Sequence, residues 1–345
     1  MSGAVLARYH RRNRRRLLLV AGMGLAAVLA LVLDMTTGPA GLPFGQVLGA
    51  LTGLVEVPRA AEVIVWNVRL PVALMALLVG AALALAGAEM QTVLENPLAE
   101  PFTLGVSAAA ALGAAMAIVL GLVIPGLPPV WGVSANAFLF ALGALLLLQL
   151  LGRLRGGGTE VLILFGIALN FAAGAFLSLL QFVASADALQ QLVFWTMGSL
   201  ASATLTSVKI LALALLATAP FAFRASWQLT ALRMGEEQAR SYGVDVTRLR
   251  RWALLRVSLL AASAVSMVGI IGFVGLAGPH IARMLVGEDH RFLLPASILT
   301  GALVMSLASV LSKVVVPGVL LPVGLVTSLI GLPIFFALIL RGRAR

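Results

Sequence analysis

The chain has no cysteine and few charged residues. The absence of cysteine excludes disulfides and thiolate metal sites. Of the 345 residues, 61% are hydrophobic and 11% are charged, whereas a soluble domain carries roughly 25% charged residues. So little charge cannot cover a water-facing surface, and we expect lipid to surround most of the protein. The apolar blocks are continuous and do not alternate with polar residues, which excludes an outer-membrane barrel.

The residues of common catalytic and metal-binding motifs are scarce. Histidine occurs only at positions 10, 280 and 290, and no two of these have metal-ligand spacing on a helix. Neither HExxH nor G-x-S-x-G occurs. Lys209 and Lys313 are the two lysines, and neither follows a glycine, which excludes a P-loop. The hypothesis of an intramembrane enzyme therefore has no catalytic motif in its favour. If the protein uses ATP, another subunit must hydrolyse it. We expect no metal and no cofactor bound by this chain.

The apolar blocks also lack the Asp, Glu and Arg relays of ion-coupled transporters. Asp34 and Asp187 lie near the ends of blocks. This disfavours an ion-coupled secondary transporter but leaves it open, because backbone carbonyls and Ser or Thr hydroxyls also bind ions at broken helices.

Positive charge is concentrated at the chain ends and in a few loops. The net charge is +11, and its distribution follows the positive-inside rule, so nucleic-acid binding is disfavoured. The basic stretch RYHRRNRRR precedes the apolar run LLLVAGMGLAAVLALVLDM. We interpret this as an uncleaved first helix with its basic end in the cytoplasm. A cleaved signal peptide is the alternative, but the run is long for one and no A-x-A site closes it.

Nine apolar blocks approach or exceed the ~20 residues that cross a bilayer as a helix. They lie near 17–34, 63–88, 102–124, 134–152, 160–183, 205–223, 252–276, 292–312 and 321–340. Nine passes would leave the basic tail RGRAR outside. A tenth, half-length pass within 275–291, turning at Gly278-Pro279, removes this conflict with the positive-inside rule. We therefore expect an all-α polytopic membrane protein of about ten helices with both termini cytoplasmic.

The predicted organisation is one transmembrane domain with short basic ends. The domain covers 17–340, preceded by a basic cytoplasmic segment at 1–16 and followed by a basic tail at 341–345. The loops near 89–101, 153–159 and 224–251 are expected on the cytoplasmic side.

Two polar segments stand out from this apolar background. In ENPLAEP, Pro97 and Pro101 stand four residues apart and disfavour helix at the cytoplasmic end of the second span. A plain interhelical turn is the alternative to a functional role. The loop 224–251 is polar and helix-forming, with breaks at Gly235 and Gly243. Its apolar positions predict short amphipathic helices that need a protein partner, or that lie on anionic lipid. These positions are Leu229, Leu232, Ala239 and Tyr242.

Four ordered stretches resemble the signatures of one family. They are RLPVALMALLVGAALALAGAEMQTVLENPLAEPFTLGVS (69–107), LRMGEEQARSYGVDVTRLR (232–250), VGIIGFVGLAGPHIARMLVGEDHRFLLPASILTGA (268–302) and LPVGLVTSLIGLPIFFALIL (321–340). Across about 63–340 the chain resembles the FecCD-type permease subunits of ABC importers for ferric siderophores, haem or cobalamin.

The resemblance implies an assembly as well as a fold. It implies the permease of a type II ABC importer, paired as a homodimer in a bacterial or archaeal cytoplasmic membrane. Two ABC ATPase subunits, which bind ATP and Mg, would lie below it, and a periplasmic or lipid-anchored substrate-binding protein above it.

The resemblance also assigns roles to cytoplasmic residues. Asn96 and Leu98 would help to close the cytoplasmic exit, and Thr159 and Glu160 would form a second part of this gate. Two short helices within 232–243 would dock into the ATPase, with Gly235 as the break and Glu236 as a cap. The coupling residues implied in this way are Leu232, Gly235, Glu236, Ala239 and Gly243.

On the external face, the resemblance implies basic residues that grip the binding protein. Arg69 matches one such position, and it could instead anchor its helix at the membrane interface. Val72 stands where a second arginine is usual, Lys313 replaces a third, and Leu320 replaces an acidic residue. Lysine cannot form a bidentate fork, so docking would be looser or would shift to Arg59.

The substrate class is narrowed only by resemblance. FWTMGSL is similar to haem permeases, whereas PGVLLPVG is more similar to siderophore permeases. We favour a ferric siderophore, with haem next; cobalamin, an oxyanion and an ion-coupled secondary transporter stay open. His280 lies in a P-H-x-x-R motif that the family carries whatever its substrate, which favours a structural role over haem ligation.

Overall fold

The computed structural model describes residues 3–39, 41–154, 159–316 and 318–342, and every regular element in these ranges is helical. In chain order these are α1 (Gly3–Thr36), α2 (Phe44–Thr52), α3 (Arg59–Ile64), the π-helix η1 (Val65–Arg69), α4 (Leu70–Val93), η2 (Pro101–Leu104), α5 (Val106–Leu120), η3 (Pro129–Trp131), α6 (Gly132–Leu154), α7 (Thr159–Val183), α8 (Ala186–Thr196), α9 (Leu205–Arg224), α10 (Ser226–Leu232), α11 (Glu236–Ser241), α12 (Val246–Val268), α13 (Val274–Val286), α14 (His290–Val314) and α15 (Val323–Gly342). This confirms the all-α prediction.

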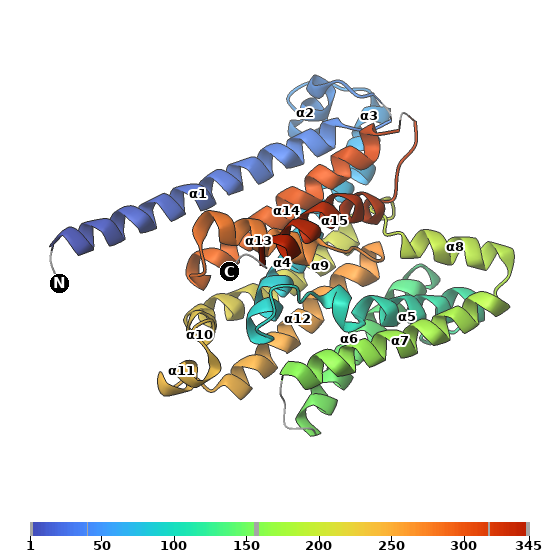
Figure 1. Ribbon diagram of the computed structural model, residues 1–345. Coiled ribbons are helices and arrows are strands. Elements are labelled where there is room, and N and C mark those ends of the chain that lie inside the picture. Colours follow the sequence, from blue (N-terminus) through green and yellow to red (C-terminus); the bar gives the residue numbers. More distant parts are fainter. Residues whose placement is uncertain (1–2, 40, 155–158, 317, 343–345) are drawn as a thin grey trace.

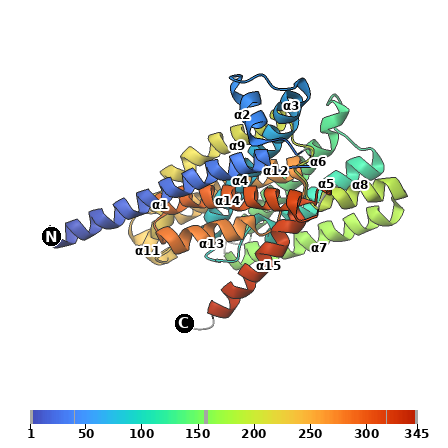
Figure 2. The ribbon, with the colours of Figure 1, turned by 90° about the horizontal axis from the view of Figure 1, so that it is seen from above.

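Seven of the described helical stretches are long and apolar enough to cross a membrane, and three more apolar helices are shorter. The short ones are Val106–Leu120, Val274–Val286 and Val323–Pro333. Seven and three make ten candidates, in keeping with the expected number. How many of them cross the bilayer, and on which side the termini lie, stay predictions. Both views place the first turns of α1 and the last turns of α15 toward the end of the bundle that carries α11, opposite α8 (Figures 1 and 2).

Helix α4 forms the centre of the bundle. It packs against α9, α12, α13 and α14, and every residue from Val79 to Val93 is buried. Such a helix is apolar all round rather than on one stripe, which is why its sequence reads as a continuous apolar run.

Glycines allow the backbones around α4 to approach closely. A Cβ on Gly87 would collide with the carbonyl oxygen of Gly275 in α13, and one on Gly80 would collide with that of Gly301 in α14. In lipid there is little hydrophobic force between helices, so close backbone packing supplies much of the association energy. These contacts hold α4, α13 and α14 together.

The half-length helix is present, but the predicted turn at Gly278-Pro279 is wrong. Helix α13 runs through Pro279, and the chain turns earlier, between Gly269 and Phe273, which both have positive φ angles. Proline has no N–H to donate to the carbonyl four residues before it, here that of Gly275. The side chain of Gln91 donates to this carbonyl instead, at 3.3 Å, so the helix continues.

We predict that Gly87→Ala destabilises the protein, because the added methyl group must push α13 away from α4. Overpacking of this kind typically costs about 1–3 kcal/mol. The matched control is Gly22→Ala in α1, where nothing lies within 4 Å of the added atom. The measurement is the temperature at which the detergent-solubilised protein loses its monodisperse elution peak. Equal values for the two variants would contradict the close contact.

Candidate gate and coupling site

The segment 94–105, here called the gate segment, connects α4 to α5. The side-chain oxygen of Asn96 accepts from the backbone N–H of Leu98 at 2.9 Å, and the N–H of Ala99 donates to the carbonyl of Asn96 at 3.1 Å. Glu95 takes a positive φ of 50°. These local bonds replace helical ones at the first proline, which confirms the predicted non-helical turn. Asn96 and Leu98 are half-buried in it.

Glu100 ties the gate segment to the short helix α13. Its buried carboxylate accepts from the N–H of Phe273 at 3.4 Å, at the first residue before α13. The first N–H groups of a helix have no partner within that helix, and Glu100 accepts a hydrogen bond from one at the start of α13. The sequence reasoning did not single out Glu100, although an acidic residue beside a proline in so apolar a region was a usable signal.

The second predicted part of the gate lies at the start of α7. Thr159 is half-buried and Glu160 is exposed. Helix α7 packs on η2 in the gate segment, where a Cβ on Gly166 would lie 2.7 Å from the side chain of Leu104. Within the described ranges, no hydrogen bond or ion pair joins Thr159 or Glu160 to Asn96 or Leu98. Their gate role stays a prediction.

The loop between α9 and α12 contains two short helices, but not both within 232–243. Helix α10 ends at Leu232, and α11 follows the break at Gly235, whose φ is 115°. Gly243 ends the segment with a φ of 83°. Glycine adopts such angles without strain, so both predicted breaks are confirmed and the position of the first helix is corrected.

The apolar face of this loop is turned mainly into the chain itself. Leu229, Leu232 and Ala239 are buried, so they are satisfied without a partner subunit. The large apolar groups that this loop leaves on the surface include Trp227 in α10, and Met234 and Tyr242, which are 54% and 56% exposed. Met234 and Tyr242 flank α11 and offer a better contact for a partner than the buried Leu229, Leu232 and Ala239. The sequence reasoning missed Met234.

Glu236 forms ion pairs and does not cap α11. Its carboxylate pairs with Arg240 at 2.7 Å and with Arg250 at 3.1 Å. The hydrogen bond from Arg240, together with Arg250, holds the pKa of Glu236 below its ordinary value. The carboxylate therefore stays ionised at neutral pH.

Three successive residues in the last turn of α4 bond to side chains that lead to the short helices α10 and α11, here called the coupling helices after the role that the family resemblance predicts for them. Arg250 is the first connection. Its Nε donates to the carbonyl of Val93 at 2.9 Å, while its Nη2 pairs with Glu236 and lies 3.9 Å from Glu95. One buried guanidinium thus joins α11, the end of α4 and the gate segment.

His290 makes the second connection and is fully buried. Its Nε2 lies 2.8 Å from the hydroxyl of Thr92 in α4, and its Nδ1 lies 3.2 Å from the hydroxyl of Thr230 in α10. The backbone N–H of His290 also donates to Thr230, at 3.0 Å. His290 thus connects α4 to α10 through the two nitrogen atoms of its ring. From the sequence, this residue was considered only as a possible metal ligand.

Arg283 makes the third connection. It donates to the side chain of Gln91 at 3.1 Å and pairs with Glu288 at 3.1 Å. Glu288 in turn pairs with Arg233, just after α10, at 3.0 Å. The three connections start from Gln91, Thr92 and Val93, so the last turn of α4 is fastened to both coupling helices.

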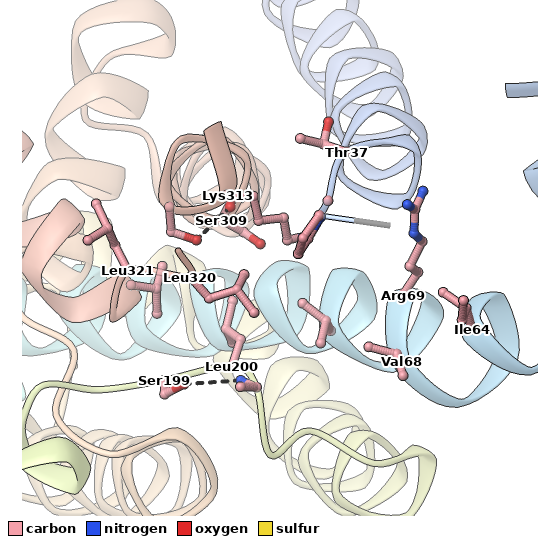
Figure 3. A pocket seen from close by; sticks show the side chains of 16 residues that line it. Thr37, Ile64, Val68, Arg69, Ser199, Leu200, Ser309, Lys313, Leu320 and Leu321 are labelled. Carbon is pink, nitrogen blue, oxygen red and sulfur yellow. Dashed lines mark hydrogen bonds between the residues drawn. The ribbon is translucent and has the colours of Figure 1, made fainter. Parts of the chain in front are cut away.

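At the opposite end of the bundle, four of the five positions considered for docking from the sequence line one cavity of about 320 Å³. These are Arg69, Val72, Lys313 and Leu320, and Figure 3 shows the cavity with α1 beside it. Val72 and Leu320 contribute apolar side chains to the lining of this cavity.

The two basic groups in this cavity are bound to the end of α1. Arg69 is only 5% exposed and donates to the carbonyl of Met35 at 2.8 Å. Lys313 pairs with the carboxylate of Asp34 at 2.6 Å, and Ser309 donates to the same oxygen at 2.9 Å. This geometry favours the anchoring role for Arg69. Arg59, at the start of α3, is exposed and is the best placed of the three for a partner.

No group of three His, Cys, Asp or Glu side chains in the described ranges could hold a metal ion. His280 lies half-buried within α13. The contacts described in this subsection are ion pairs and hydrogen bonds that position helices relative to one another.

Comparison with known proteins places this geometry in a family. The profile of the FecCD transport family matches residues 25–341. The chain is 38% identical to the hemin transport system permease of Yersinia pestis over 81% of this chain and 84% of that protein. It is 37% identical to the ferric enterobactin transport system permease of Escherichia coli over 94% and 96%, and 34% identical to the vitamin B12 import system permease of Klebsiella pneumoniae over 99% and 98%.

The fold agrees with these sequence matches. A solved ABC transporter assigned to the metal-chelate type, in an inward-facing conformation, superimposes with a TM-score of 0.82 at 31% identity. The match covers 94% of this chain and 99% of that one. The chain is therefore a multi-pass membrane protein that belongs to the FecCD transport family.

Proposed function

We propose that the chain is the membrane-spanning permease subunit of an ATP-binding-cassette importer that moves an iron chelate across the cytoplasmic membrane. A ferric siderophore is the favoured substrate, with haem next. The single observation that carries the proposal is the triple connection from the coupling helices α10 and α11 to the end of α4, beside the gate segment. An importer driven from the cytoplasm needs such a connection, whereas an enzyme or a passive membrane anchor does not.

In this mechanism the chain supplies no energy of its own. Its sequence has no P-loop, so ATP and Mg bind in a separate ATPase subunit. That subunit engages the exposed side of α11 through Met234 and Tyr242. Its movement on ATP binding is passed by Arg250, His290 and Arg283 to the end of α4, and so to Asn96 and Leu98. Packed helices joined in this way move as rigid bodies.

The assembly is a homodimer with two ATPase subunits and one external binding protein. In support, α7 exposes large apolar side chains along its length, including Phe171, Phe176 and Phe182. A second copy and lipid together would cover this face. The binding protein docks at the end of the bundle that carries α2 and α3, with Arg59 exposed there, while Arg69 and Lys313 hold α1 in place. No cofactor is bound by the chain, and nucleic acid is not a partner.

The substrate class rests on the relatives, whose names refer to hemin, enterobactin and vitamin B12. A cobalamin or oxyanion permease is the alternative within the same mechanism. An ion-coupled secondary transporter is the alternative from another class, and it differs in its source of energy.

Reconstitution in proteoliposomes tests the proposal. With its ATPase and binding protein, the chain is expected to accumulate a labelled ferric siderophore only when ATP is on the ATPase side. Haem and cobalamin, offered in parallel, identify the substrate class. Accumulation by the chain alone, driven by a proton or sodium gradient, would contradict the proposal.

We predict that Glu236→Gln lowers uptake severalfold while ATP hydrolysis continues. The change removes the ion pair between α11 and Arg250 but leaves the bond from Arg250 to Val93 intact. Because Glu236 is partly exposed, the loss of fold stability should be about 1 kcal/mol or less. Arg250→Gln, which cuts both bonds, should uncouple more strongly.

The control is Arg251→Gln, which removes a neighbouring exposed arginine outside this connection. The measurement is the number of substrate molecules imported per ATP hydrolysed. A ratio equal to that of the unaltered complex in both Glu236→Gln and Arg250→Gln would refute the role of this connection.

A further inference from the structure

A groove lies on the surface between the end of α9, α10 and the first half of α12. Its volume is about 810 Å³. Arg224 and Gln228 line it from one side and Arg248 and Trp252 from the other, with Phe221 at its apolar end. Of the coupling residues discussed above, Gly243 lies at its edge, and the three connections to α4 do not pass through it.

The polar end of the groove carries two unneutralised cations. The guanidinium groups of Arg224 and Arg248 are exposed and form no ion pair within the described chain. Asp245 also lines the groove, and its carboxylate accepts from the backbone N–H of Arg248 at 2.9 Å as the cap of α12. Arg256, deeper in the groove, is paired with the buried Glu89. The groove therefore favours an anion at the level of the two free arginines.

The apolar end of the groove is lined by Phe221 in α9 and by Leu255 and Leu259 in α12. Phe221 is 61% exposed. Outside the groove, α9 also exposes Ile210, Leu213 and Leu216. Trp252 is also exposed, as is Trp227 at the start of α10. Tryptophan is typical of the boundary between hydrocarbon and water. A ligand that fills this surface must have a long apolar part and an anionic head.

We propose that this groove binds an anionic phospholipid of the cytoplasmic leaflet, with its phosphate between Arg224 and Arg248 and an acyl chain between α9 and α12. Basic pockets between helices at the cytoplasmic surface bind such head groups. A soluble phosphate would use the arginines but not the apolar face. The inference rests on the predicted membrane orientation of α9 and α12, and not on transport itself.

The location of the groove gives the lipid a consequence for coupling. Gln228 belongs to α10, and Gly243 and Asp245 directly follow α11. A bound lipid would therefore contact both ends of the segment that contains α10 and α11, where this segment joins α9 and α12, and would hold these two ends in place.

Quenching of tryptophan fluorescence by brominated lipids tests the proposal without ATP or partner subunits. The protein is placed in vesicles that contain phosphatidylcholine and phosphatidylglycerol, with bromine on one or the other. The signal that Trp252→Phe removes reports on the groove. We expect brominated phosphatidylglycerol to compete for this position on the order of tenfold better than brominated phosphatidylcholine, from two arginines at the surface.

The double variant Arg224→Gln/Arg248→Gln should lose this preference, and Arg251→Gln, an exposed arginine outside the groove, should keep it. Both substituted side chains are exposed, so the double variant should fold normally, which its elution profile checks. Equal quenching by the two lipids, or an unchanged preference in the double variant, would overturn the proposal.

Two other occupants give different results. Full competition by inorganic phosphate would identify a soluble-anion site and would overturn the lipid. Loss of ATPase binding by the double variant in detergent free of anionic lipid would identify a protein interface and would also overturn it. Because the assay needs no transport, a negative result here leaves the proposed importer function standing, and failed transport leaves the lipid site standing.

Discussion

Gln91, Thr92 and Val93 form the last turn of α4, and each bonds to a side chain from a different helix, α13, α14 and α12 in turn. His290 is fully buried, and Arg250 and Arg283 are largely so. Leaving a buried polar group without its hydrogen-bond partner destabilises the structure strongly. The coupling helices therefore cannot move away from α4 without breaking several costly bonds, and the most economical motion carries the end of α4 with them.

The rest of α4 makes that motion a collective one. Backbone contacts at Gly80 and Gly87 leave no room for α13 or α14 to slide independently. Glu100 then joins the start of α13 to the gate segment. A displacement at α11 thus reaches the gate segment by two routes, through Arg250 to Glu95 and through α4 and α13 to Glu100. At the other end of the bundle, Arg69 and Lys313 fasten α1 to the same framework.

The sequence predicted the features that depend on local chemistry. Continuous apolar runs predicted the membrane helices, two prolines predicted the turn around Asn96, and two glycines predicted the breaks beside α11. The turn at Gly278-Pro279 was predicted wrongly because the proline was considered without Gln91, which bonds the freed carbonyl of Gly275. That partner is 184 residues away in the sequence.

The features that sequence could not reveal are those built from distant residues. Arg250 and Val93 are 157 residues apart, and Thr92 and His290 are 198 apart. The packing of α10 and α11 likewise decides whether Leu232 and Ala239 face a partner subunit or the core of this chain. The spacing of these residues in the sequence does not show that packing. The same holds for Arg69, whose guanidinium turns toward Met35 rather than outward.

The central claim is that ATP binding in the ATPase subunit moves the gate segment through α10, α11 and α4. Its most direct test is the chemical reactivity of residue 98 in the gate segment, measured with and without ATP. The chain has no cysteine, so Leu98→Cys gives it a single thiol, and labelling of the assembled complex by a water-soluble thiol reagent is measured on this chain after the subunits are separated. We expect a severalfold change in labelling rate on ATP binding, and loss of this change when Thr230→Val, Glu236→Gln and Glu288→Gln together interrupt all three connections. The same ATP-dependent change in the presence of these three substitutions would contradict the central claim.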